Sequence, residues 1–97
     1  MKTLKTIRVI LKEHKDYLIS YFKVKVIGIF GSYSRHEARK KSDIDILVEF
    51  SETPDFFEFI RLEEYLQGLL GMKIDLVTRD ALKPVVKNAI LRETKYI

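Results

Sequence analysis

The chain has 97 residues, no cysteine and a formal net charge of +4, from 18 basic and 14 acidic side chains. This length predicts a single domain over residues 1–97, with one hydrophobic core and no room for a second substrate-binding lobe. The lack of cysteine excludes disulfides and thiolate metal sites, and no apolar run is long enough to cross a bilayer.

The first residues are interrupted by charges and show no signal peptide, so we expect a cytoplasmic protein. The positive charge suits a triphosphate or an acidic partner, and an ion-paired, solvated surface is an equally good explanation. Aromatic and basic residues are not interleaved as they are in stacking platforms for nucleic acid. We therefore do not expect nucleic acid as a direct partner.

Apolar residues at helical spacing predict a helix over residues 4–22 with a turn near His14. Residues 24–30 are rich in β-branched side chains and predict a buried strand that ends at Gly31-Ser32. A short helix after this strand would expose unpaired backbone N–H groups, which together with the helix dipole favour an anion. Phosphate is the natural ligand for such a loop.

A second buried strand is predicted over residues 44–50, with Asp43 and Asp45 at its start. Successive side chains of a strand alternate between faces, so both carboxylates project to the same side, roughly 7 Å apart along the backbone. This spacing lets both carboxylates reach one metal centre.

Farther along the chain, Asp55 starts a helix whose apolar side, beginning with Phe56, packs on the sheet, and Gly71 ends it. Asp75 lies within a third short apolar strand over residues 73–77, and Pro84 fits the first turn of a last helix. The elements predict an α/β (α+β) fold, a small mixed β-sheet with helices packed mainly on one face.

Burying an unpaired carboxylate costs several kcal/mol, so acids in apolar strands indicate a cation beside them. Mg²⁺ prefers oxygen ligands and is commonly held by protein carboxylates together with substrate phosphates. Asp43, Asp45 and Asp75 suit two such ions around a nucleoside triphosphate.

Plainer explanations exist for the same residues. Asp43 and Asp45 can be solvated acids at a strand start, and Asp75 can be a sheet-edge acid paired with Lys73. Ser32 can cap the short helix, which does not prevent contact with phosphate.

The segment GSYSRHEARKKSDID, residues 31–45, resembles the signature of minimal nucleotidyltransferases (MNT) of the DNA polymerase-β-like superfamily. The family form is GSxARGEAxxxSDID, with a third Asp on a later strand. Ser34 stands where alanine is usual and His36 where glycine is usual, and neither change removes an expected metal ligand. The resemblance implies the polymerase-β-like nucleotidyltransferase fold.

The resemblance also implies roles for individual residues. Asp43, Asp45 and Asp75 would be catalytic and would bind two Mg²⁺ ions, with Asp75 helping to deprotonate the acceptor hydroxyl. Gly31-Ser32 would hold the β and γ phosphates of ATP, helped by Arg35.

Stand-alone domains of this family are similar to the antitoxin of HEPN and MNT toxin–antitoxin pairs, which transfers AMP from ATP to a tyrosine hydroxyl of the toxin. The resemblance therefore implies adenylylation of a HEPN partner, in a homo- or hetero-oligomer. One alternative is a non-catalytic module that masks its partner and has a degenerate nucleotide site. Another is nucleotidyl transfer to a small molecule or RNA with a separate acceptor-binding subunit.

Overall fold

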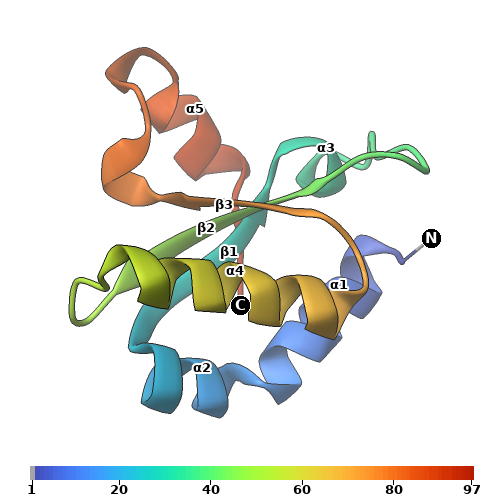
Figure 1. Ribbon diagram of the computed structural model, residues 1–97. Coiled ribbons are helices and arrows are strands. Elements are labelled where there is room, and N and C mark those ends of the chain that lie inside the picture. Colours follow the sequence, from blue (N-terminus) through green and yellow to red (C-terminus); the bar gives the residue numbers. More distant parts are fainter. Residues whose placement is uncertain (1) are drawn as a thin grey trace.

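A four-stranded mixed sheet organises the protein, whose computed structural model describes residues 2–97 (Figure 1). Its strand order is β3-β2-β1-β4. The strands are β1 (Val24–Phe30), β2 (Ile44–Phe50), β3 (Ile74–Thr78) and β4 (Lys95–Tyr96). β1 pairs antiparallel with β2 and with β4, whereas β3 runs parallel to β2.

Three helices cover one face of the sheet, and the remaining helices lie on the other side (Figure 1). The covering helices are α1 (Leu4–Glu13), α2 (Lys15–Phe22) and α4 (Phe56–Leu70). The other side carries α3 (Gly31–Ser34) and α5 (Pro84–Glu93), and a 3₁₀ turn, η1 (Arg79–Ala81), follows β3. The predicted α/β fold, with helices mainly on one face, is confirmed.

Local sequence signals set the helix boundaries. α1 and α2 are separated at His14, as predicted, and α5 begins with Pro84. Asp55 and Glu58 form a capping box: the Glu58 N–H donates to Asp55 Oδ1 at 2.7 Å, and the Asp55 N–H donates to Glu58 Oε1 at 3.1 Å. α4 ends at Gly71, which adopts the left-handed conformation at φ 64°.

The hydrophobic core lies between the sheet and the three covering helices. Its fully buried side chains include Ile7, Leu11, Leu18, Ile29, Ile44, Ile46, Val48, Leu62, Leu66 and Leu70. Along β2, Ile44 and Ile46 point into this core, so the alternation of the strand turns Asp45 to the opposite face. Burial of the isoleucines thus decides where the acid projects.

Two features differ from the sequence predictions. β4 was not predicted, because two residues are too short to display a strand period. Phe56 was expected in the core but is 72 % exposed, since it is the first residue of α4 and the stripe that faces the sheet begins at Phe59. Within residues 2–97, no helix combines the length and apolar character needed to cross a membrane.

Gly68 offers a test of the helical conformation of α4. It is exposed within α4, and a Cβ atom at this position would meet nothing within 4 Å. Gly68→Ala should raise the free energy of unfolding by roughly 0.5–1 kcal/mol, because alanine loses less backbone entropy in a helix. Thermal unfolding should show a midpoint a few degrees higher, and a lower midpoint would contradict this description of α4.

Candidate active site

Asp45 lies at the centre of a group of polar residues brought together by the sheet. The strand register places Phe30 of β1 opposite Asp45 on one side and Asp75 of β3 opposite it on the other. Phe30 is the last residue of β1, and α3 begins at the next residue, Gly31. The Gly-Ser loop and two of the three aspartates therefore meet at one edge of the sheet.

Gly31 lies directly against the Asp45 carboxylate. Its φ is +71°, in the left-handed region, and a Cβ atom built on it would lie 2.0 Å from Asp45 Oδ2. An L side chain would be strained by the backbone and would also displace the carboxylate. Glycine is therefore required here for two reasons, one conformational and one steric.

Asp45 and Asp75 form a pair of like charges. The pKa of Asp45 is raised to about 6, first by burial, then by the charge of Asp75 and a hydrogen bond between the two carboxyl groups. The charge of Asp43 raises this pKa further, and Arg35 opposes the shift. None of the ion pairs found within residues 2–97 includes Asp43, Asp45 or Asp75. A bound cation would relieve this repulsion, and carboxylate oxygens suit Mg²⁺.

Asp75 is exposed, which corrects the argument that an apolar strand buries it. β3 is an edge strand, so water reaches this side chain even though Ile74 and Leu76 on either side are buried. This position fits the plainer explanation of Asp75 as an acid at the sheet edge. The residue opposite Asp75 on the neighbouring strand β2 is nevertheless Asp45 and not a lysine.

Asp43 lies outside the strand register that pairs Asp45 with Asp75. It precedes β2 by one residue and is exposed, so the strand alternation that was expected to align it with Asp45 does not extend to it. It lines a depression of about 510 Å³ together with Lys40, Lys41 and Lys73. Among residues 2–97, no three His, Cys, Asp or Glu side chains are gathered closely enough to hold a metal by themselves. A metal would need further oxygen ligands from water or substrate.

The Gly-Ser loop forms the first turn of α3, whose N-cap residue, Phe30, makes no side-chain cap. The first N–H groups of a helix have no intrahelical acceptor and suit an anion. Ser32 is the second residue of α3 and half-buried, so it is not the cap that the plainer explanation supposed.

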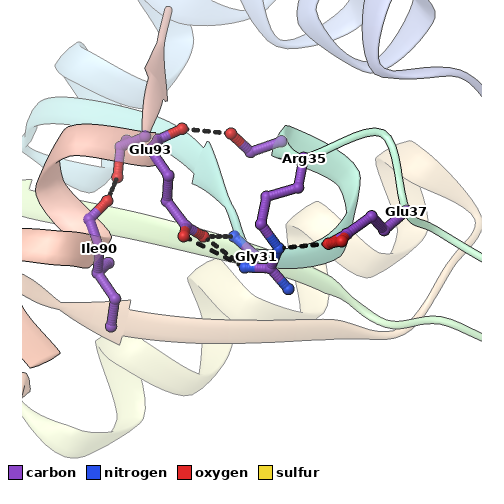
Figure 2. A network of polar contacts seen from close by, with 7 residues as sticks. Gly31, Arg35, Glu37, Ile90 and Glu93 are labelled. Atoms are coloured by element: carbon purple, nitrogen blue, oxygen red, sulfur yellow. Dashed lines mark hydrogen bonds and ion pairs between the residues drawn. The ribbon is translucent and has the colours of Figure 1, made fainter.

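An acceptor for one of these N–H groups comes from the far end of the chain (Figure 2). The Gly31 N–H donates to Glu93 Oε2 at 2.5 Å. The Arg35 guanidinium donates to the same carboxylate, with Nη1 at 2.9 Å from Oε2 and 3.2 Å from Oε1. Glu93 therefore bridges two of the groups that the sequence assigned to phosphate.

Arg35 also contacts Glu37. Its Nε lies 2.8 Å from Glu37 Oε1. Hydrogen bonds to Glu37 and then to Glu93 raise the pKa of the Arg35 guanidinium, which keeps it charged.

The two departures from the family form have structural explanations. His36 adopts φ +59°, a left-handed conformation that favours glycine, so the loop keeps the backbone shape that glycine would give. Ser34 is buried, and its hydroxyl donates to the backbone oxygen of Glu93. Serine therefore ties α3 to the end of α5, a contact that alanine could not make.

Glu93 was not identified from the sequence. It lies 62 positions from Gly31, and no local motif surrounds it. One weak signal exists: Glu93 is the last residue of α5, where the helix dipole disfavours a carboxylate unless another group holds it.

A separate groove of about 570 Å³ lies beside the loop, between α1 and β4, with Arg8, His36 and Tyr96 among its lining residues. None of the three aspartates lines it. Its larger volume therefore does not make it the centre of the chemistry, which we place at the carboxylate pair.

Comparison with known proteins shows the relationships of the chain. Residues 11–97 match the nucleotidyltransferase domain family. The protein adenylyltransferase MntA of Thermococcus cleftensis is 50% identical over 97 residues, covering 100% of this chain and 98% of that relative.

Two solved structures show the same fold. One, described as a candidate minimal nucleotidyltransferase, has a TM-score of 0.81 and 35% identity, covering 97% of this chain and 95% of that chain. The other is a chain from the complex of tri-AMPylated Shewanella oneidensis HEPN toxin with MNT antitoxin. Its TM-score is 0.64 at 25% identity, covering 93% of this chain and 70% of that chain.

Gly31→Ala tests the close approach of the loop to Asp45. We expect a loss of roughly 1–3 kcal/mol in the free energy of unfolding, from the left-handed backbone and the steric overlap. Thermal unfolding measures the loss, with Gly68→Ala as the matched glycine control. Equal stability of the wild-type and Gly31→Ala proteins would contradict the geometry of the loop.

The raised pKa of Asp45 predicts a pH dependence of stability. A folded-state pKa of about 6 against an unfolded value of 3.8 stabilises the fold at low pH, and this contribution is lost as pH rises through about 6. Asp45→Asn should therefore match the wild type below about pH 3.8 and melt a few degrees higher near pH 8, an effect limited by solvent screening of a half-buried group. Parallel melting curves of the two proteins across this range would exclude the assignment.

Proposed function

Because the chain belongs to the nucleotidyltransferase domain family, we propose that it transfers AMP from ATP to a hydroxyl group of a partner HEPN toxin and thereby acts as its antitoxin. The observation that carries this proposal is the Asp45–Asp75 carboxyl pair, set against the Gly31-Ser32 loop. The adenylyltransferase name of the Thermococcus cleftensis relative and the AMPylated toxin in the Shewanella oneidensis complex support it.

The nucleotide would bind through its phosphates. The N–H groups at the start of α3 and the guanidinium of Arg35 are donors suited to phosphate oxygens, and Ser32 in the same turn carries a further hydroxyl donor. We propose that Gly31, Ser32 and Arg35 hold the β and γ phosphates. This places the α-phosphorus toward the carboxyl pair.

We propose two Mg²⁺ ions as cofactors, held by Asp43, Asp45 and Asp75. The donor set fits, because carboxylate oxygens are hard ligands and the paired carboxylates form no ion pair with a side chain of residues 2–97. Mg²⁺ normally retains waters and phosphate oxygens, so a complete protein cage is not required. When bound, Mg²⁺ would neutralise phosphate charge and lower the pKa of the acceptor hydroxyl.

In the transfer step, the acceptor oxygen forms a bond to the α-phosphorus while the bond to the bridging oxygen of the β-phosphate breaks, and pyrophosphate leaves. The hydroxyl proton passes to the carboxylate of Asp75, which is exposed at the sheet edge and accessible to an acceptor from another molecule. The chain contributes mainly positioning and charge neutralisation.

We propose that a separate chain supplies the acceptor, a tyrosine of the HEPN partner, and that residues 1–97 form one nucleotidyltransferase domain. The known S. oneidensis complex, described as tri-AMPylated toxin with MNT antitoxin, supports such an arrangement.

The decisive experiment mixes the purified protein with Mg²⁺, α-labelled ATP and a candidate HEPN partner protein, and follows label and intact mass on each polypeptide. We expect AMP on a partner tyrosine. Asp43→Asn combined with Asp45→Asn should reduce transfer by at least roughly 100-fold, because a metal site supplies several kcal/mol of transition-state stabilisation.

Glu49→Gln is the matched control, since it removes another acid of β2 that pairs weakly with Arg79, at 3.9 Å. Circular dichroism checks that the double variant is folded. A tight complex without label from any nucleotide would favour the masking module over the enzyme. Label on a small molecule or RNA would identify a different acceptor.

A further inference from the structure

The carboxylate of Glu93 lies in the loop that we propose binds phosphate. It accepts hydrogen bonds from the Gly31 N–H and from the Arg35 guanidinium, which are two of the donors proposed for the nucleotide (Figure 2). A planar anion with two acceptor oxygens bridging a backbone N–H and a guanidinium uses the same chemistry as a bound phosphate group. The carboxylate thus takes the place of a substrate phosphate.

The fold holds Glu93 in this position at some cost. A negative charge at the C-terminal end of a helix is disfavoured by the helix dipole, and Glu93 is the last residue of α5. Two further contacts fix the backbone around Glu93. The Ser34 hydroxyl donates to the backbone oxygen of Glu93, and Thr94 Oγ1 donates to the backbone oxygen of Ile90 at 2.7 Å. The Glu93 side chain is only 23% exposed. These contacts direct the carboxylate at the loop.

We propose that Glu93 is a positioning residue that keeps the phosphate loop in shape without nucleotide and is displaced by a nucleotide phosphate on binding. This proposal rests on the proposed function of the loop. The single Gly31 N–H can serve the nucleotide only after it leaves Glu93, and the displaced carboxylate remains a like charge nearby. Glu93 therefore lowers nucleotide affinity, and its return to Gly31 promotes release of pyrophosphate.

The test measures the dissociation constant of Mg-ATP by calorimetry for the wild type and for Glu93→Gln. Removing the competing charge should lower this constant roughly 3- to 10-fold, because the loop donors no longer have to exchange a charged hydrogen-bond acceptor. An unchanged or higher constant in a folded Glu93→Gln protein would overturn the proposal, since a merely structural role predicts weaker binding.

Glu37→Gln is the matched control. Glu37 contacts the same guanidinium as Glu93, with Glu37 Oε1 at 2.8 Å from Arg35 Nε. The Gly31 N–H, in contrast, donates to Glu93. Its removal should change the constant less than about twofold, because the nucleotide displaces no carboxylate from the Gly31 N–H in this case. An equal gain in both variants would show that only the charge near Arg35 matters, and would overturn the assignment to Glu93.

A second measurement needs no variant and applies even if Glu93→Gln fails to fold. NMR of the wild type follows the amide of Gly31 and the side-chain carboxyl carbon of Glu93 during titration with Mg-ATP and, separately, with inorganic pyrophosphate. Displacement predicts that both resonances shift together and saturate at one ligand concentration. A Glu93 carboxyl signal unmoved at saturation would overturn the proposal.

These experiments test the role of Glu93 in nucleotide binding separately from the proposed AMP transfer. Tighter binding in Glu93→Gln without AMP transfer to any partner would support the role of Glu93 and refute the proposed function. AMP transfer together with unchanged nucleotide binding in Glu93→Gln would support the proposed function and refute the role of Glu93.

Discussion

The close approach of the Gly31 backbone to the Asp45 carboxylate is the constraint on which the site depends. It keeps the acid partly buried beside Asp75, an arrangement that is unfavourable unless a cation or a proton compensates. The pKa of Asp45 is raised to about 6, first by burial and then by the charge of Asp75. The fold maintains this arrangement because Ile44 and Ile46, on either side of Asp45, are fully buried and fix the strand.

The topology of the sheet explains why these groups meet at all. β1 is antiparallel to β2, so the end of β1 lies beside the start of β2. β3 is parallel to β2, so the starts of these two strands also lie together. The Gly31-Ser32 loop, Asp45 and Asp75 therefore reach one sheet edge from separate parts of the chain. The proposed cation-binding pair next to the proposed anion-binding loop would suit a metal-bound triphosphate, which carries both positive and negative charge.

The end of α5 adds a second level to this electrostatic arrangement. Glu93 supplies the anion that the loop would otherwise lack, and Ser34 fastens the helix end that carries it. In this chain the serine and the glutamate act on the same junction between α3 and α5. Exchange of an internal carboxylate for a substrate phosphate then links nucleotide binding to the C-terminal helix, which lies far from the loop in sequence.

The sequence by itself determined the elements that depend on neighbouring residues. Strands over residues 24–30 and 44–50, the cap at Asp55 and the stop at Gly71 follow from local periodicity, side-chain capping and glycine conformation. The spacing of the Gly-Ser and Asp-x-Asp motif likewise indicated the family. These signals are readable because each involves residues within a few positions of one another.

Only the tertiary structure decided the features that depend on strand register and on contacts between distant segments. It set Asp75 opposite Asp45, left Asp43 beside the strand and exposed Phe56. It also added β4 to the edge of β1 and brought Glu93 to Gly31 across 62 positions. The physical reason is that a local pattern specifies which face of an element is apolar, whereas packing of the whole chain selects the partner that faces each polar side chain.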